Sequence, residues 1–74
     1  MLYDPHLDLF LQVAELGSFS KAAEARYITP SAVIKQINLL EDELGVRLFE
    51  RTHRGLKLTK AGESLKKDAP ELIG

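Results

Sequence analysis

Three polar residues with helical spacing are the first candidates for a binding surface. Ser31, Lys35 and Asn38 follow one another at i, i+4 and i+7, which places them on one face of a helix. Hydroxyl, ammonium and amide groups can all donate hydrogen bonds to base edges or to phosphates. An ordinary solvent-exposed helix face is the alternative interpretation.

A second cluster is basic and lies around a predicted tight turn. Arg51, His53 and Arg54 come within four residues, and Gly55 follows them. Arginine is attracted to a narrow minor groove by its negative potential. A solvated hairpin is the alternative, with Arg51 paired internally to an acid such as Glu41.

The charge distribution favours nucleic acid more than the net charge does. The 74 residues carry a net charge of −1, but residues 1–50 have a balance of −4 and residues 51–67 a balance of +5. DNA responds to the local field of the surface that it meets. A purely solvated basic surface would show the same pattern.

Catalytic arrangements are not evident. There is no cysteine, and the two histidines, His6 and His53, are far apart in the sequence. A metal held by His6 and Asp8 is conceivable, but a surface histidine near an aspartate is usually only solvated. We therefore expect neither an enzyme nor a cofactor or metal. The sequence has no apolar run of membrane-spanning length and no signal peptide, so we expect a cytoplasmic protein without a membrane partner.

The apolar spacing predicts three helices before the basic turn. The first covers residues 4–16, with Asp4 as its cap and Gly17 after its end. Its predicted buried stripe is Leu7, Phe10, Leu11 and Ala14. The second is short: it begins at Ser18 or Ser20, ends near Tyr27, and carries Arg26 in the middle of its apolar face, with the stem along the core.

The third predicted helix runs from Pro30 to Leu44, with Thr29 as its cap and Gly45 as its end. Its core stripe is expected to be Val33, Ile37, Leu40 and Leu44. The polar trio then points away from the core, with Ile34 at the edge of the stripe.

A β-hairpin and a fourth helix should follow. Residues 46–51 and 56–58 are strand candidates on either side of the turn at residues 52–55. Thr59 can cap a helix that runs to about Asp68 with Ala61, Leu65 and Ala69 on one face, and Pro70 should break or kink it. The predicted fold is mainly α: a winged helix-turn-helix with a three-helix core, a two-stranded hairpin wing and a fourth linker helix. We assign residues 1–58 to the DNA-binding domain and residues 59–74 to a truncated linker or dimerisation helix and tail.

The order of short motifs resembles the N-terminal domain of LysR-type bacterial transcription regulators. The motifs are Ser18-Phe19-Ser20, Ala22-Ala23, Ser31-Ala32-Val33, Gln36-Ile37, Leu40-Glu41, Leu44-Gly45, Leu48-Phe49, Arg51, Arg54-Gly55, Leu58-Thr59 and Ala61-Gly62. The resemblance covers roughly residues 5–68. It implies binding to double-stranded operator DNA as a dimer or tetramer. It also implies a C-terminal domain that senses a small effector; that domain is absent here, so we expect an excised domain or a truncated product.

The sequence departs from the family's usual pattern at four positions. Arg26 stands where a leucine is usual, Pro30 where a base-contacting glutamine is common, and Ile34 where a serine is common. Ile34 can contact a thymine methyl instead. Pro70 interrupts the linker helix, so we expect a monomer or a weak homodimer.

Together these observations predict sequence-specific DNA binding for transcription regulation, with the third helix in the major groove and the wing near the minor groove or backbone. The predicted DNA-binding residues are Thr29, Pro30, Ser31, Ile34, Lys35, Asn38, Arg51, His53, Arg54 and Lys57. The alternative is a winged-helix module for protein interaction or dimerisation, which would use Leu39, or Leu2 with Tyr3.

Overall fold

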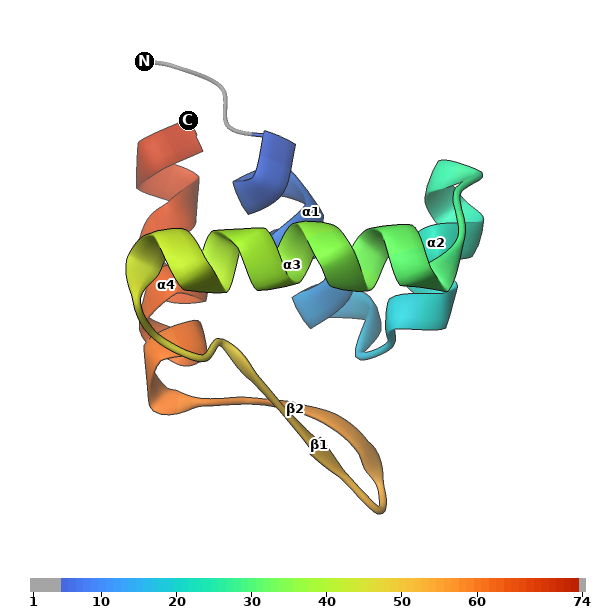
Figure 1. Cartoon of the computed structure of the whole chain (residues 1–74). Coiled ribbons are helices and arrows are strands. Elements are labelled where there is room, and N and C mark those ends of the chain that lie inside the picture. The colour runs from blue at the N-terminus through green and yellow to red at the C-terminus, as the bar shows by residue number, and fades with distance from the viewer. Residues whose placement is uncertain (1–4, 74) are drawn as a thin grey trace.

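The computed structural model describes the backbone of residues 5–73 and the side chains of residues 5–68. The elements in order are α1 (Pro5–Leu16), α2 (Phe19–Arg26), α3 (Pro30–Leu44), β1 (Phe49–Thr52), β2 (Gly55–Leu58) and α4 (Lys60–Ile73). In Figure 1, α3 crosses in front of α1, with α2 beside its first half and α4 beside its last. The hairpin of β1 and β2 extends below α3. This is the predicted winged helix-turn-helix.

Local sequence signals set the helix boundaries. The side chain of Ser18 caps α2 by accepting a hydrogen bond from the Lys21 amide at 3.2 Å, which decides between the two serines. Thr29 caps α3 in the same way through the Ala32 amide at 3.1 Å, and Pro30 is the first helical residue. Gly45 ends α3 in the left-handed conformation, at φ 71°. These predictions are confirmed; the Asp4 cap lies outside the described residues.

The core lies where the first three helices meet the base of the hairpin. Its fully buried side chains are Leu9, Phe10, Val13, Ala22, Ala23, Val33, Ile37, Leu40 and Leu48, and Leu7 is nearly so. The stripe predicted for α1 was partly wrong, because Leu11 and Ala14 are only half-buried. The prediction also missed Leu9 and Val13, which are buried. Because α1 packs against α2, α3 and α4, its buried face is centred on Leu9, Phe10 and Val13 and not on the predicted stripe.

The last turn of α3 also differs from the prediction. Leu44 is 48% exposed, whereas Glu41 is buried at 7%. The chain turns at Gly45 towards the hairpin, so the core ends at Leu40 and the polar side chain of Glu41 faces the returning backbone. Leu48, which follows the turn, is buried in the core instead.

The fourth helix is longer than predicted. Thr59 caps it, accepting from the Gly62 amide at 3.0 Å, and Ala61 and Leu65 are half-buried as expected. The sequence predicted a break or a kink at Pro70: the break was wrong, because the helix continues to Ile73, and the kink stays a prediction. A proline removes one backbone donor but leaves the following residues free to remain helical. The side chain of Ala69 lies outside those that the structure describes.

Candidate nucleic-acid interface

The turn between α2 and α3 sets the position of the proposed reading helix. Tyr27 adopts a left-handed conformation at φ 58°, and its amide donates to the Glu24 carbonyl at 3.2 Å. The next amide, that of Ile28, donates to the Ala23 carbonyl at 3.1 Å. This pair of bonds closes α2, so that only Ile28 and Thr29 separate Tyr27 from the start of α3.

The outer face of α3 carries the polar trio. Ser31, Lys35 and Asn38 are exposed, and Ile34 between them is half-buried. Together with Leu39 and Asp42 they line a shallow hollow along the helix. The first half of this face thus offers a hydroxyl, an ammonium and an amide, and an acid occurs only at its far end.

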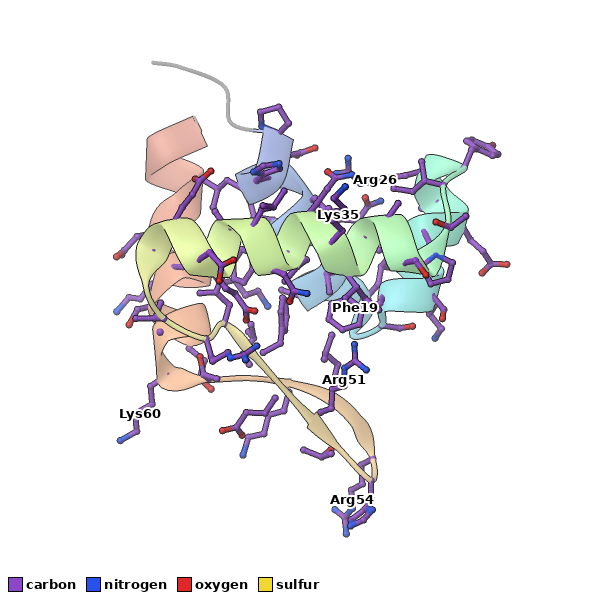
Figure 2. The ribbon with its side chains drawn as sticks, in the orientation of Figure 1. Phe19, Arg26, Lys35, Arg51, Arg54 and Lys60 are labelled. Atoms are coloured by element: carbon purple, nitrogen blue, oxygen red, sulfur yellow. The ribbon has the colours of Figure 1, made fainter. Side chains whose placement is uncertain are left out.

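A tight turn closes the tip of the hairpin. The Thr52 hydroxyl accepts from the Arg54 amide at 3.2 Å and donates to the Gly55 carbonyl at 3.0 Å, which holds the turn closed. Gly55 has φ 115°, a value that side-chain-bearing residues rarely adopt. His53 and Arg54 form the two-residue turn between the strands and are exposed. Figure 2 shows Arg54 at the tip of the hairpin.

Lys57 lies on a different face of the hairpin. It pairs with Glu50 across the two strands, whereas its neighbours Leu56 and Leu58 pack against the core. Because side chains alternate along a strand, Lys57 faces away from the core with an acid beside it. The Glu50 carboxylate opposite it partly offsets its charge.

Arg51 points from β1 towards α2 and lies over an aromatic ring. Its Cζ is 5.3 Å from the centroid of Phe19 (Figure 2). That ring meets Phe49 edge-on at 5.8 Å, and Phe49 meets Phe10 of α1 at 5.3 Å. The aromatic series anchors the hairpin to the helices and holds an exposed guanidinium at the mouth of the space between them.

Glu41 fixes the base of the hairpin. Its Oε2 accepts from the Leu48 amide at 2.7 Å and from the Phe49 amide at 3.4 Å, and its Oε1 lies 3.5 Å from Arg47 Nη1. The hypothesis that Glu41 pairs with Arg51 was wrong, because the carboxylate is occupied by the chain segment directly before β1. Arg47, 80% exposed in its side chain, is a cation that the sequence interpretation did not select. It lies just before the basic run of residues 51–67, and its position four residues ahead of Arg51 was the available signal.

The helix face and the hairpin border a common groove. An open groove of about 670 Å³ lies between them, with Ile34 and Asn38 on one wall and Arg51, Thr52 and Thr59 on the other. Arg47 lies at the same groove. Since Ile34 and Asn38 also line the hollow on α3, the two surfaces are continuous.

Arg26 joins α2 to α1 rather than merely reaching water. Its Nη2 donates to Asp8 Oδ2 at 2.8 Å, and its Nε donates to Gln12 Oε1. The guanidinium therefore has partners in the position where a leucine is usual, and it ties together two of the helices that support α3.

The described residues, 5–73, offer neither a metal site nor a membrane span. That part of the chain contains no group of three or more histidine, cysteine, aspartate or glutamate side chains suited to hold a metal ion. Within the same residues, no helix combines the length and apolar character required to cross a bilayer.

Comparison with known proteins decides the family. The family model described as "Bacterial regulatory helix-turn-helix protein, lysR family" matches residues 5–63. This chain belongs to the lysR family. It carries the DNA-binding domain of a LysR-type transcription regulator.

Two regulators from Klebsiella pneumoniae illustrate the relationship. The HTH-type transcriptional activator AllS is 49% identical over 74 residues, covering 99% of this chain and 27% of AllS. The probable HTH-type transcriptional regulator LtrA is 44% identical over 69 residues, covering 93% of this chain and 22% of LtrA. The lysR-family chain therefore spans about a quarter of the length of these relatives.

A solved structure shows the same fold. The crystal structure of the CbnR_DBD–DNA complex superposes with a TM-score of 0.87 at 36% identity, covering 97% of this chain and 83% of that one. The winged helix-turn-helix predicted from the sequence is thus the fold of this lysR-family domain.

Proposed function

We propose that this domain binds operator DNA in a sequence-specific manner, with the first half of α3 in the major groove and the hairpin tip at the minor groove or backbone. The observation that carries the proposal is the continuity of the two surfaces: Ile34 and Asn38 line both the hollow on α3 and the groove against the hairpin. A major groove admits one helix, and the adjacent phosphate strand then falls between that helix and the wing.

Most of the predicted residues have a place in this arrangement. Ser31, Lys35 and Asn38 face the bases or their flanking phosphates, and Arg51 faces the strand in the groove. His53 and Arg54 reach beyond that strand from the hairpin tip. Thr29 and Pro30 lie at the start of α3, where backbone amides also favour phosphate. Lys57 contributes least, because Glu50 is opposite it.

A salt titration of duplex binding tests this proposal. Fluorescence anisotropy with a duplex selected from a random pool gives affinity against salt concentration. Replacing a cation that contacts phosphate should lower the log–log slope by about one. We expect this for Arg54→Ala. The matched control is Lys67→Ala on α4, which lies at the opposite end of α3 from α2 (Figure 1) and should leave the slope unchanged. Equal slopes for Arg54→Ala and wild type would contradict the placement of the wing.

The proposed role is binding rather than catalysis, and its site is the bacterial cytoplasm, where the DNA lies. The relatives are named as transcriptional regulators, which supports both statements. Control by a small effector would belong to a further domain of the whole regulator.

A protein-interaction role is favoured by a separate observation. Leu39, Leu44 and Val46 are 44%, 48% and 44% exposed around the last turns of α3. We propose that the domain self-associates. Either these three side chains or α4, as a linker or dimerisation helix, would form the contact. Sedimentation at low micromolar concentration, with and without a palindromic duplex, measures it. A monomer that pairs only on DNA would indicate a weak dimer; a tight dimer without DNA would contradict the expectation from Pro70.

A further inference from the structure

An aliphatic side chain occupies the centre of the face that should meet the bases. Ile34 lies one turn after Ser31 and directly beside Lys35, on the outer face of α3. It is half-buried, whereas its neighbours Val33 and Ile37 are buried in the core at 0% and 2% exposure. Ile34 borders the hollow on α3, the groove towards the hairpin and a third hollow at the start of α2. Among the residues whose side chains the structure describes, Ile34 alone is shared by these three surfaces.

The chemistry of this side chain restricts what it can face. Isoleucine neither donates nor accepts a hydrogen bond, so a base amino group or carbonyl placed against it would lose water without gaining a partner. In the major groove only thymine presents an apolar group, its C5 methyl. We propose that Ile34 is a specificity-determining residue that selects thymine through this methyl group. The inference rests on the proposed function, because it requires that α3 enters the major groove.

Pro30 extends the apolar surface by one helical turn. It precedes Ile34 by four residues, a spacing that brings two side chains onto the same helix face, and it is exposed. Its ring has no N–H to offer a base or phosphate. The ring of Pro30 and the side chain of Ile34 therefore form an apolar strip beside the donors Ser31, Lys35 and Asn38. Methyl recognition should be limited to the bases that face this strip in the first half of α3.

The test removes one methyl group from the DNA at a time. The best duplex is first selected from a random pool with the wild-type domain. Each thymine is then replaced in turn by deoxyuridine, which lacks only the C5 methyl and keeps its base pairing. Burial of one such group corresponds to a change in affinity of about three- to tenfold. We expect one thymine whose replacement weakens wild-type binding by this factor.

Matched variants connect that thymine to the side chain. Ile34→Ala should weaken binding to the thymine duplex by a similar factor and should be insensitive to deoxyuridine at that position. Ile34→Val, which keeps part of the apolar surface, should retain part of the sensitivity. Lys35→Ala is the control: it should bind more weakly but remain as sensitive to the missing methyl as wild type. Placing 5-methylcytosine instead of cytosine at the same position should recover part of the wild-type affinity.

The outcomes separate this inference from the proposed function. If the wild-type domain selects a sequence but no thymine is sensitive to deoxyuridine, the inference is overturned and DNA binding stands. It is also overturned if Ile34→Ala and Ile34→Val keep full sensitivity. If the wild type binds no duplex at low salt, both fail together.

Discussion

The guanidinium of Arg51 lies over the ring of Phe19, with Cζ 5.3 Å from the ring centroid. The two residues belong to the hairpin and to α2, so the contact fixes a cation of the wing relative to the helix-turn-helix. A planar guanidinium can lie flat on a ring, whereas an ammonium is a compact and more strongly hydrated charge. The geometry of this cation therefore depends on arginine in particular.

Two replacements of Arg51 separate its charge from its position. Arg51→Gln should lower both the DNA affinity and the log–log salt slope, the latter by about one, because a charge is lost. Arg51→Lys should preserve the slope and still lose affinity, because the stacked geometry is lost. Exposed cation–π contacts stabilise by about 0.5–1 kcal/mol, so unfolding in urea should change by no more than that in either variant. Equal salt slopes for the two variants would show that Arg51 does not meet the DNA backbone.

Removing the Glu41 carboxylate should destabilise the fold. It accepts from the buried Leu48 amide at 2.7 Å, and that donor has no replacement partner in Glu41→Ala. Hydrogen bonds to charged groups contribute about 1.5–3 kcal/mol, so we expect a loss of this size in the free energy of unfolding. Urea denaturation measures it. The control is Glu43→Ala, an exposed acid on the same turn, which should change stability by less than about 0.5 kcal/mol. Similar values for the two variants would refute the anchoring role of Glu41.

A methyl group at Gly62 should not fit. A Cβ at this position would lie 2.2 Å from the Leu48 carbonyl oxygen and 2.8 Å from Leu58 Cδ2. Since the first neighbour is backbone, either α4 or the hairpin must shift, and overpacking of this kind costs about 1–3 kcal/mol. Thermal unfolding of Gly62→Ala should show the loss. The exposed Ser64→Ala on the same helix should be neutral or stabilising, since alanine favours helix.

The link between Arg26 and α1 should contribute modestly. Its side chain is 29% exposed and that of Asp8 is 43% exposed, so solvent screens the pair. We expect Arg26→Leu, the residue usual in the family, to change the free energy of unfolding by no more than about 1 kcal/mol. High salt should weaken the wild type more than this variant. A loss above about 2 kcal/mol for Arg26→Leu would show that the bond to Gln12 and the packing of the arginine stem matter more than the ion pair.

The sequence predicted the helices well because their boundaries depend on neighbouring residues. Thr29, Pro30 and Gly45 act within one turn of themselves, so their effect can be inferred without knowing the fold. The effect of Pro70 on the length of α4 was overestimated, because the local cost of a proline does not decide whether the residues around it are helical.

Contacts between residues on different elements could not be predicted from local sequence signals. The partners of Glu41 are amides of a segment that returns only after Gly45, and the partners of Arg26 lie on α1, 14 and 18 residues away. Neither pairing has a periodic signal in the sequence. The ten residues expected to contact DNA stay a prediction. The structure brings Ile34, Asn38 and Arg51 to one groove, and it leaves Lys57 on another face.

Thr59 links the start of α4 to the base of the hairpin through hydrogen bonds. Its hydroxyl donates to the Arg47 carbonyl at 2.6 Å, its amide donates to the Leu48 carbonyl at 3.0 Å, and Gly62 packs against that same carbonyl. A torque applied along α4 would therefore reach the hairpin through these hydrogen bonds, in addition to the packing of α4 against α1. In a dimer joined through α4, the angle between the two α4 helices would set the distance between the two hairpins and their tilt relative to the dimer axis.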